Sequence, residues 1–210
     1  MYNHKLTGLY AITDAAQNDQ QQLITDVEQA LLGGARIIQY RDKTTQHDQR
    51  CDTAKQLRKL TRQHNALLII NDDVNLASNS HADGVHLGCD DVPISAARTQ
   101  LGSDAIIGVS CYNDFSLAKQ ATNNGADYIA FGRFFPSHTK PDAIQANIET
   151  LQRAKRELDI PVAAIGGITA ENAATLINAG ADMLAIINDV FSQADIKTAA
   201  QHYQKFFAGK

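Results

Sequence analysis

The sequence predicts a single-domain α/β protein, a (β/α)8 or TIM barrel, and three observations support this fold. Short runs rich in Ile, Val, Leu and Ala alternate with longer segments of helical composition along the chain. The apolar runs are nearly continuous, which is typical of parallel strands that are buried on both faces. Eight such units fit into 210 residues, and eight strand–helix units close a compact barrel.

Predicted strands and helices alternate along most of the chain. The apolar runs predict strands at 6–13, 35–42, 66–72, 84–88, 106–111, 126–132, 161–167 and 181–188. Helical patterns fill most gaps, at about 20–33, 47–64, 94–101, 114–124, 147–158, 170–179 and 195–208. Only a very short helix fits between the third and fourth strands. Thr169 followed by Asn172 indicates a helix N-cap arrangement after the seventh strand.

The chain shows no internal boundary. No Pro-rich, Ser-rich or charged linker divides it, so residues 1–210 are expected to form one domain. A doubly wound open sheet is the alternative architecture. Such sheets usually have fewer strands, and no G-x-G-x-x-G follows the first strand here.

Composition narrows the class of function. Hydrophobic residues make up 44% and charged residues 20%, as in globular proteins. The net charge of -4, without a long basic run, argues against a broad nucleic-acid surface. No apolar run is long enough to span a membrane, and no secretory signal is visible. The three cysteines lack C-x-x-C spacing, so we expect reduced thiols in a cytoplasmic protein.

In a barrel the active site lies at the carboxyl ends of the strands, so polar residues there are candidates for function. The second strand ends in "QYRDK", where alternation points Gln39, Arg41 and Lys43 the same way. An amide and two cations at the barrel mouth suit a polyanion such as diphosphate. The alternative is a basic strand end that pairs with acids such as Asp42.

Carboxylates follow the third and fourth strands, in "INDD" and "HLGCDD". Oxygen ligands from two neighbouring loops suit Mg²⁺, which also bridges to substrate phosphates. The alternative is that these aspartates cap helices or start turns. The residues alone do not say which aspartate of each pair would bind a metal.

The later strand ends add hydroxyl groups, a cation and two glycines. Ser110 ends the fifth strand, but no G-x-S-x-G motif supports a serine nucleophile. After the sixth strand the loop carries two hydroxyls and an ammonium group, on Ser137, Thr139 and Lys140, and we expect His138 between them to face solvent.

Gly166 and Gly167 end the seventh strand. They are expected to run directly into a helix N-terminus, which is a common phosphate site because its backbone N–H groups are unpaired. One barrel mouth would then hold two anion sites. This layout fits two phosphorylated substrates, one of which leaves as diphosphate.

Seven segments occur in the order and spacing typical of one family. They are "QYRDK", "INDDVNLA", "ADGVHLGCDD", "IIGVSCYND", "GADYIAFGRFFPSHTK", "PVAAIGGIT" and "AGADMLAIIN", within residues 6–190. On these motifs the chain resembles the thiamine phosphate synthase family. The resemblance implies a transferase of thiamine biosynthesis that joins a pyrimidine diphosphate to a thiazole phosphate, with Mg²⁺ assisting the loss of diphosphate.

The resemblance also implies roles for individual residues. Binding of the pyrimidine diphosphate would fall to Gln39, Tyr40, Arg41, Asp42, Lys43, Asn71, Ser110 and Lys140. Among these, the residues expected to take part in catalysis are Arg41, Lys43, Ser110 and Lys140. The Mg²⁺ ligands would be Asp72 and Asp91. The thiazole phosphate would be bound by Ser137, His138, Thr139, Gly167, Ile187 and Asn188.

Four positions depart from the family pattern as the resemblance has it. The family usually has Gln at Cys89, His at Tyr112 and Ser at Asn188, and it often has Thr at Ser137. The Asn188 position bears on phosphate binding if the serine hydroxyl, rather than the backbone, makes the contact.

Other functions are compatible with the same fold. A thiazole tautomerase would not need the full diphosphate and Mg²⁺ set, and a non-catalytic sensor of thiamine intermediates could do without it. A phosphosugar isomerase would need a Glu–His acid/base pair, which no strand end provides convincingly. A homo-oligomer is compatible with the pattern, although no apolar stripe is diagnostic of one.

Overall fold

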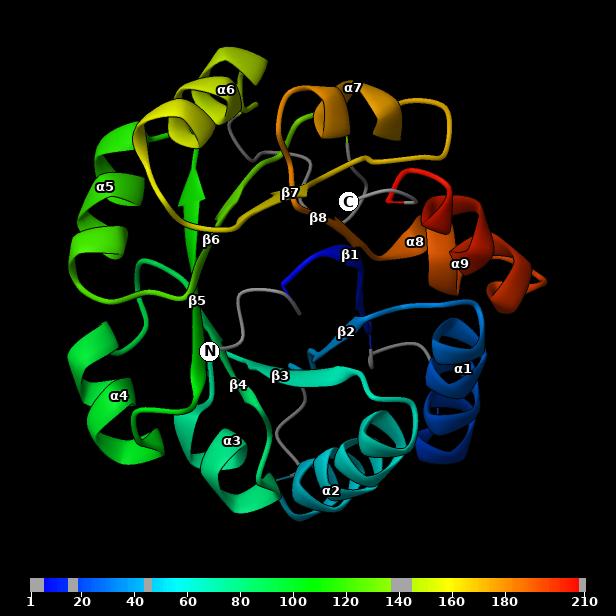
Figure 1. Cartoon of the computed structure of the whole chain (residues 1–210). Helices are drawn as coiled ribbons and strands as arrows, with labels where there is room; N and C mark the ends of the chain where they lie inside the picture. Colours follow the sequence, from blue (N-terminus) through cyan, green and yellow to red (C-terminus); the bar gives the residue numbers. More distant parts are fainter. Residues whose placement is uncertain (1–5, 15–18, 44–46, 137–144, 208–210) are drawn as a thin grey trace.

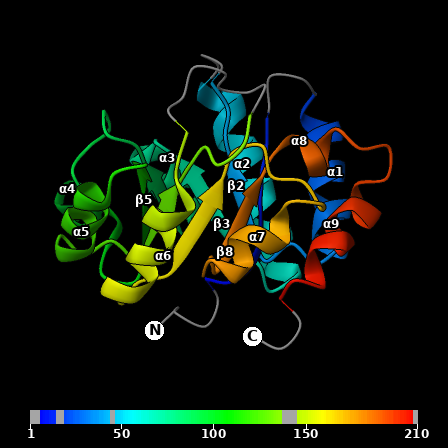
Figure 2. The ribbon, with the colours of Figure 1, turned by 90° about the horizontal axis from the view of Figure 1, so that it is seen from above.

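The predicted barrel is confirmed. The computed structural model describes residues 6–14, 19–43, 47–136 and 145–207, and its eight parallel strands close into a barrel in sequence order. The first strand pairs with the last, with Gly8 opposite Met183. Helices surround the barrel (Figure 1), and the view turned by 90° shows them on either side of the strands (Figure 2).

The strands are short and almost completely buried, as the continuous apolar runs predict. They are β1 (Gly8–Ile12), β2 (Ile37–Tyr40), β3 (Leu67–Asn71), β4 (Gly84–Leu87), β5 (Ile106–Tyr112), β6 (Tyr128–Phe131), β7 (Val162–Ile165) and β8 (Met183–Ile186). All of them fall at the predicted positions. The second, seventh and eighth strands each end two residues earlier than expected, and after the eighth the chain turns into a short helix at Asn188.

The helices also follow the predicted order. They are α1 (Gln20–Leu32), α2 (His47–Gln63), α3 (Val74–Ser80), α4 (Ile94–Leu101), α5 (Phe115–Asn123), α6 (Ile148–Glu157), α7 (Ala173–Asn178), α8 (Asn188–Phe191) and α9 (Ile196–Gln204). The short α8 was not predicted. Among the described residues, the helices are too short or too polar to cross a bilayer.

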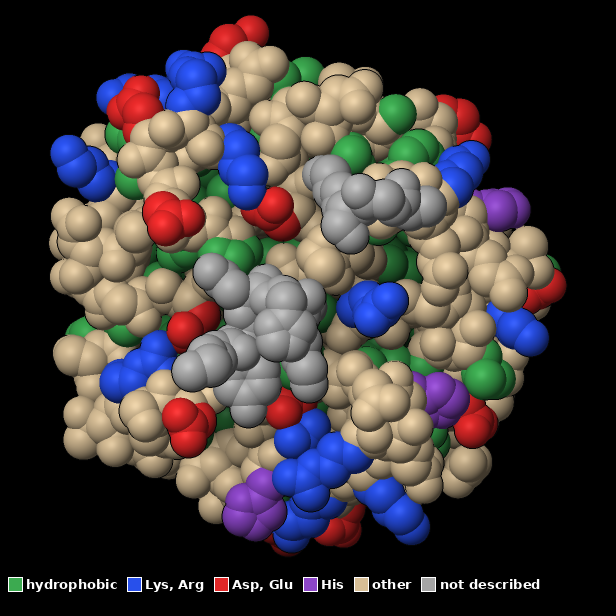
Figure 3. All heavy atoms as spheres, in the orientation of Figure 1, with side chains coloured by type: hydrophobic (Ala, Val, Ile, Leu, Met, Phe, Trp, Pro, Cys, Tyr) green, Lys and Arg blue, Asp and Glu red, His purple; other side chains and the backbone are tan. Residues whose placement is uncertain are grey.

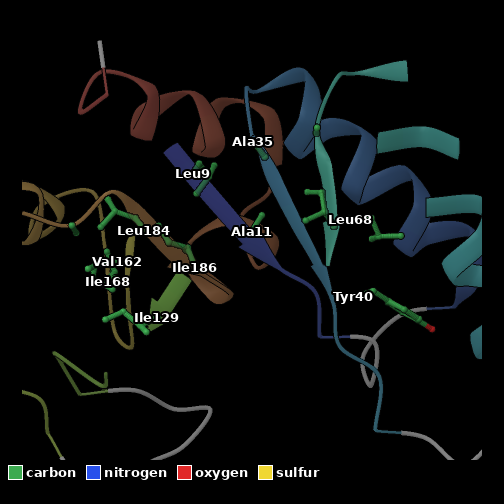
Figure 4. Close-up of a cluster of buried hydrophobic side chains, with 14 of the residues drawn as sticks. Leu9, Ala11, Ala35, Tyr40, Leu68, Ile129, Val162, Ile168, Leu184 and Ile186 are labelled. Carbon is green, nitrogen blue, oxygen red and sulfur yellow. The ribbon is translucent and has the colours of Figure 1, made fainter. Parts of the chain in front are cut away.

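Strand alternation divides the core into two layers. Side chains such as Leu9, Leu68 and Leu184 point outward and pack against the helices (Figure 4). Their neighbours, such as Tyr10, Ile37 and Met183, form a separate cluster inside the barrel. The period of two along each strand therefore decides which residues can reach the barrel interior.

Three aspartates tie the amino ends of strands to a helix. Each directly precedes an even-numbered strand, and its Oδ2 accepts the N–H of a residue in the preceding strand at 2.8–2.9 Å. The aspartate N–H donates back to the carbonyl of that same residue. Oδ2 also pairs with a cation from a helix. These strand latches, written as aspartate–strand residue–helix cation, are Asp83–Leu68–Arg58, Asp127–Ile107–Arg98 and Asp182–Val162–Lys155.

Candidate active site

A cavity of about 400 Å³ opens at the carboxyl ends of the strands, and every strand contributes to its lining. This is the end of a barrel at which catalytic residues are found. Residues expected at both anion sites line this one cavity: Gln39, Arg41, Asn71, Ser110, Gly167, Ile187 and Asn188. Four further predicted residues lie outside the described part of the chain: Ser137, His138, Thr139 and Lys140.

The end of β2 presents alternate side chains to two different environments. Gln39 and Arg41 line the cavity, as the alternation predicts. Tyr40 points outward into the helix-facing core (Figure 4), and its hydroxyl donates to Asp42 Oδ2 at 2.9 Å. Burial, followed by this bond to a carboxylate, raises the pKa of Tyr40. Tyr40 and Asp42 were predicted to bind the pyrimidine diphosphate, but neither lies among the described residues that line the cavity.

Arg41 is held at the rim from two sides. Its backbone N–H donates to Thr13 Oγ1 at 3.1 Å, which fixes the strand end. Its Nη1 lies 3.9 Å from Asp14 Oδ1, a distance that holds the guanidinium only weakly. The guanidinium is therefore positioned but remains available to a bound anion.

Lys43, Asp72 and Asp91 form a cluster of charges beside the cavity. Lys43 Nζ lies 2.5 Å from Asp72 Oδ2, and Asp91 Oδ2 accepts the N–H of Gly88 at 2.6 Å. Burial opposes ionisation of Asp72, but hydrogen bonds with Lys43 and Asp91 outweigh it and lower its pKa. Burial and the charge on Asp72 raise the pKa of Asp91. The hydrogen bond from the Gly88 N–H acts in the opposite direction but does not outweigh them.

The side chains of Asp72 and Asp91 interact, which contributes to the raised pKa of Asp91 and the lowered pKa of Asp72. Two neighbouring carboxylates repel each other when both are charged. A divalent cation would relieve the same repulsion. Mg²⁺ is bound through one or two carboxylates together with waters and substrate phosphates. The two side chains therefore fit Mg²⁺.

The structure separates the aspartates that the sequence left equivalent. Asp73 caps α3, with Oδ1 accepting the N–H of Leu76 at 2.9 Å, and its Oδ2 pairs with Arg50 Nη2 at 2.9 Å. Asp90 is exposed. The aspartates that interact are therefore Asp72, the first of its pair, and Asp91, the second of its pair.

The turn after β7 differs from the prediction. α7 begins at Ala173, so Gly166 and Gly167 do not run directly into a helix. Both glycines have positive φ, and a Cβ on Gly167 would lie 2.2 Å from the Pro136 carbonyl oxygen. They are needed for close packing against the loop after β6. Gly167 nevertheless lines the cavity together with Asn188, the first residue of α8.

Three interior strand residues were not singled out by the sequence analysis: Tyr10 and His86, which line the cavity, and Tyr128, which is fully buried. Hydrogen bonds link them into a continuous chain that runs between Gln39 and Ser110. The available signal was the period of two, because polar side chains at inward positions of buried strands must satisfy each other. Arg133 also lines the cavity.

Two departures from the family pattern touch each other at the cavity rim. The hydroxyl of Tyr112 lies 3.2 Å from Cys89 Sγ. Tyr112 has a φ of 52° and follows a register shift between β5 and β6, which brings its ring to the cavity. The two departures are therefore structurally coupled.

Comparison with known proteins agrees with this geometry. Residues 9–190 match the family described as thiamine monophosphate synthase. The thiamine-phosphate synthase of Alcanivorax borkumensis is 50% identical over 207 residues, which is 97% of this chain and 95% of that protein. The thiamine-phosphate synthase of Methylobacillus flagellatus is 50% identical over 202 residues, with 96% of each chain covered.

A solved structure supports the same relationship. The thiamine phosphate pyrophosphorylase of Pyrococcus furiosus superposes with a TM-score of 0.88 at 36% identity, covering 99% of this chain and 98% of that one. A KDPGal structure, at 20% identity and a TM-score of 0.71, shares the fold.

Proposed function

This chain belongs to the thiamine monophosphate synthase family of transferases, and from that premise we propose its substrates and mechanism. The substrates are 4-amino-5-hydroxymethyl-2-methylpyrimidine diphosphate and 4-methyl-5-(2-hydroxyethyl)thiazole phosphate. The products are thiamine phosphate and diphosphate.

One observation supports this proposal: residues expected at both anion sites line a single cavity. On one side lie Arg41 and, beside it, the Lys43–Asp72–Asp91 cluster. On the other side lie the backbone of Gly167 and the start of α8. Two phosphorylated substrates can therefore meet with their reacting ends between these borders.

The chemistry requires one bond to break and one to form. The bond between the pyrimidine methylene carbon and the diphosphate oxygen breaks, and the electron pair leaves with diphosphate. The thiazole nitrogen then supplies its lone pair to the methylene cation. Because that nitrogen carries no proton, bond formation needs no general base.

The cations act on the leaving group. Arg41 can donate two parallel hydrogen bonds to a phosphate, and Lys43 supplies a compact charge. Both become more favourable as negative charge accumulates on the departing oxygen, so they stabilise the transition state more than the bound substrate. Lys140 is expected to act with them, and Ser110 to bind the pyrimidine ring.

Asp72 and Asp91 would hold Mg²⁺, which would neutralise diphosphate charge when it is bound. Lys43 already lies against Asp72, so the protein groups around the leaving diphosphate are assembled before substrate arrives. Small soluble substrates and free cysteines suit a cytoplasmic enzyme with no nucleic-acid or membrane partner.

The test is a direct assay of both products. Purified protein is mixed with both substrates, with Mg²⁺ or with chelator, and thiamine phosphate and diphosphate are quantified. We expect equal amounts of both products, with Mg²⁺ only. Arg41→Ala should lower kcat/KM at least about 100-fold, whereas the surface variant Arg153→Ala should match wild type.

Other outcomes would redirect the assignment. Thiazole phosphate binding without product formation would replace this function by that of a tautomerase or a sensor. Full activity in chelator would remove the metal from Asp72 and Asp91 but leave the reaction in place.

A further inference from the structure

A chain of hydrogen bonds runs through the barrel interior beneath the cavity. Gln39 Nε2 donates to Tyr10 Oη at 2.6 Å, and Tyr10 Oη lies 2.7 Å from Tyr128 Oη. Tyr128 Oη lies 2.9 Å from His86 Nδ1, and His86 Nε2 lies 2.9 Å from Ser110 Oγ. Three different strands, β1, β6 and β4, thus contribute the residues between the two ends of the chain.

The interior residues of this chain have little freedom to reorient. Tyr10 is 1% exposed, Tyr128 is 0% exposed and Gln39 is 3% exposed. The rings of His86 and Tyr128 are stacked, with centroids 5.5 Å apart. Gly108 makes room for Tyr128, because a Cβ there would lie 1.9 Å from Tyr128 Cζ.

The other three contacts allow either direction, and the bond from Gln39 favours one order of donors along the chain. Tyr10 Oη accepts from Gln39, so its own proton is directed to Tyr128, and the Tyr128 proton is directed to His86 Nδ1. The imidazole then carries its proton on Nε2 and donates to Ser110 Oγ. Burial raises the pKa of both tyrosines, so both hydroxyls keep their protons.

We propose that Tyr10, Tyr128 and His86 are positioning residues that set the hydrogen-bonding polarity of the cavity at Gln39 and Ser110. Gln39 commits its amide nitrogen to Tyr10 and therefore presents its oxygen as an acceptor. Ser110 accepts from His86 and therefore presents its hydroxyl proton as a donor. The inference rests on the proposed function and adds the basis of its specificity.

The polarity matches one class of heterocycle. An aminopyrimidine donates from its amino group and accepts at the adjacent ring nitrogen, which complements an acceptor and a donor on the protein. The corresponding oxo-pyrimidine has the inverse pattern, because its carbonyl accepts and the adjacent N–H donates. A fixed Gln39 amide should therefore reject the oxo ring.

The first experiment measures this discrimination. Inhibition constants are compared for non-reactive methylene-diphosphonate analogues that carry the amino or the oxo pyrimidine. Wild type should favour the amino form at least about tenfold, the factor expected for one mismatched buried hydrogen bond. Tyr10→Phe should reduce this preference several-fold, because the Gln39 amide could then rotate, while the KM for thiazole phosphate stays unchanged.

Two further variants make the result specific. Tyr128→Phe should also reduce the preference, because it removes the hydroxyl beside His86 Nδ1. The donor and acceptor roles of His86 and Ser110 would then no longer be fixed. Thr61→Val removes a buried hydroxyl that donates to the Arg58 carbonyl within α2, and it should leave the preference intact. An unchanged amino preference in both tyrosine variants would overturn the proposal, even if wild type makes thiamine phosphate.

The second experiment reads the polarity directly. Nitrogen NMR of ¹⁵N-histidine-labelled protein distinguishes the two neutral imidazole forms, and a His86→Gln variant assigns the signal. We expect the proton on Nε2. A proton on Nδ1, or on both nitrogens, would overturn the proposed order. If folded wild-type protein makes no thiamine phosphate, that result counts against the proposed function alone.

Discussion

Aspartates occur with cations at both ends of this barrel, but the two ends use them differently. At the amino ends of the strands, each latch carboxylate accepts a backbone N–H and pairs with a helix cation. At the carboxyl ends, Asp72 and Asp91 face each other and share Lys43. Acidic and basic side chains also lie next to one another on the face turned to the viewer in Figure 3.

The difference shows how one residue type supports either stability or chemistry. A carboxylate whose oxygen is already satisfied by the backbone and a cation has little left to offer a ligand. Two carboxylates held against each other are poorly satisfied and gain from a cation. Both ends combine aspartates with cations, so partner geometry is what separates them.

The largest expected effect is on activity, at the carboxyl end. Asp72→Asn should lower kcat at least about 100-fold, because Mg²⁺ would lose a carboxylate ligand and would neutralise the diphosphate less well. The melting temperature should change by no more than about 2 °C. The neighbouring variant Asp73→Asn is the matched control. It should retain activity and lose about 1 kcal/mol of stability through the weakened α3 cap and the lost Arg50 pair. Loss of activity in Asp73→Asn with activity retained in Asp72→Asn would show that the roles of the two aspartates are the reverse of those assigned.

The next effect is on stability, at the amino end. Asp83→Asn should lower the free energy of unfolding by about 2 kcal/mol, because Arg58 and the Leu68 N–H lose a charged acceptor in a largely buried site. Urea unfolding measures the loss, and kcat should not change. Asp104→Asn, at an exposed loop position, is the control. Equal stability of the two variants would show that the latch is not stabilising.

A smaller effect should depend on pH. The folded-state pKa of Asp91 is raised, so its contribution to stability is present below the unfolded-state pKa and is lost as pH rises through the folded-state pKa. Without divalent cations, Asp91→Asn should therefore become more stable relative to wild type as pH rises from about 4 to about 7, by up to about 1 kcal/mol.

Mg²⁺ provides the control for this pH effect. It should stabilise wild type more than Asp91→Asn and so reduce or reverse the difference at neutral pH. Thermal unfolding across pH, with and without Mg²⁺, measures both quantities. A stability difference that does not vary with pH would contradict the facing carboxylates.

The smallest effect is expected where Cys89 meets Tyr112. Both side chains are exposed, and an O–H···S contact is weak, so a double-mutant cycle of Cys89→Ala and Tyr112→Phe should give a coupling of about 0.5 kcal/mol or less in kcat/KM. A coupling of about 2 kcal/mol would show that this contact shapes the site.

The barrel was predictable because each strand is a buried run whose period fixes its inward side chains. The same reasoning placed Gln39 and Arg41 in the cavity. It also fixed the bounds of α4 at 94–101. These features depend only on local sequence and on a regular repeat.

Other features depend on partners that are distant in sequence. Asp73, rather than Asp72, caps α3 because of where that helix begins and where Arg50 reaches it. α8 has only four residues, too few to show a helical period. The importance of His86 becomes visible only when Tyr128 and Ser110 lie on either side of it.

The latches also have a consequence for the order in which the chain folds. Each joins a strand to the next one, and the bonded partners are 15 or 20 positions apart in the sequence, so it can form before the rest of the barrel. Arg36, not an aspartate, precedes β2, and β1 must find β8 across nearly the whole chain. We expect ring closure to be the late, slow event. Asp83→Asn would then slow refolding, whereas a change confined to the β1–β8 seam would mainly speed unfolding.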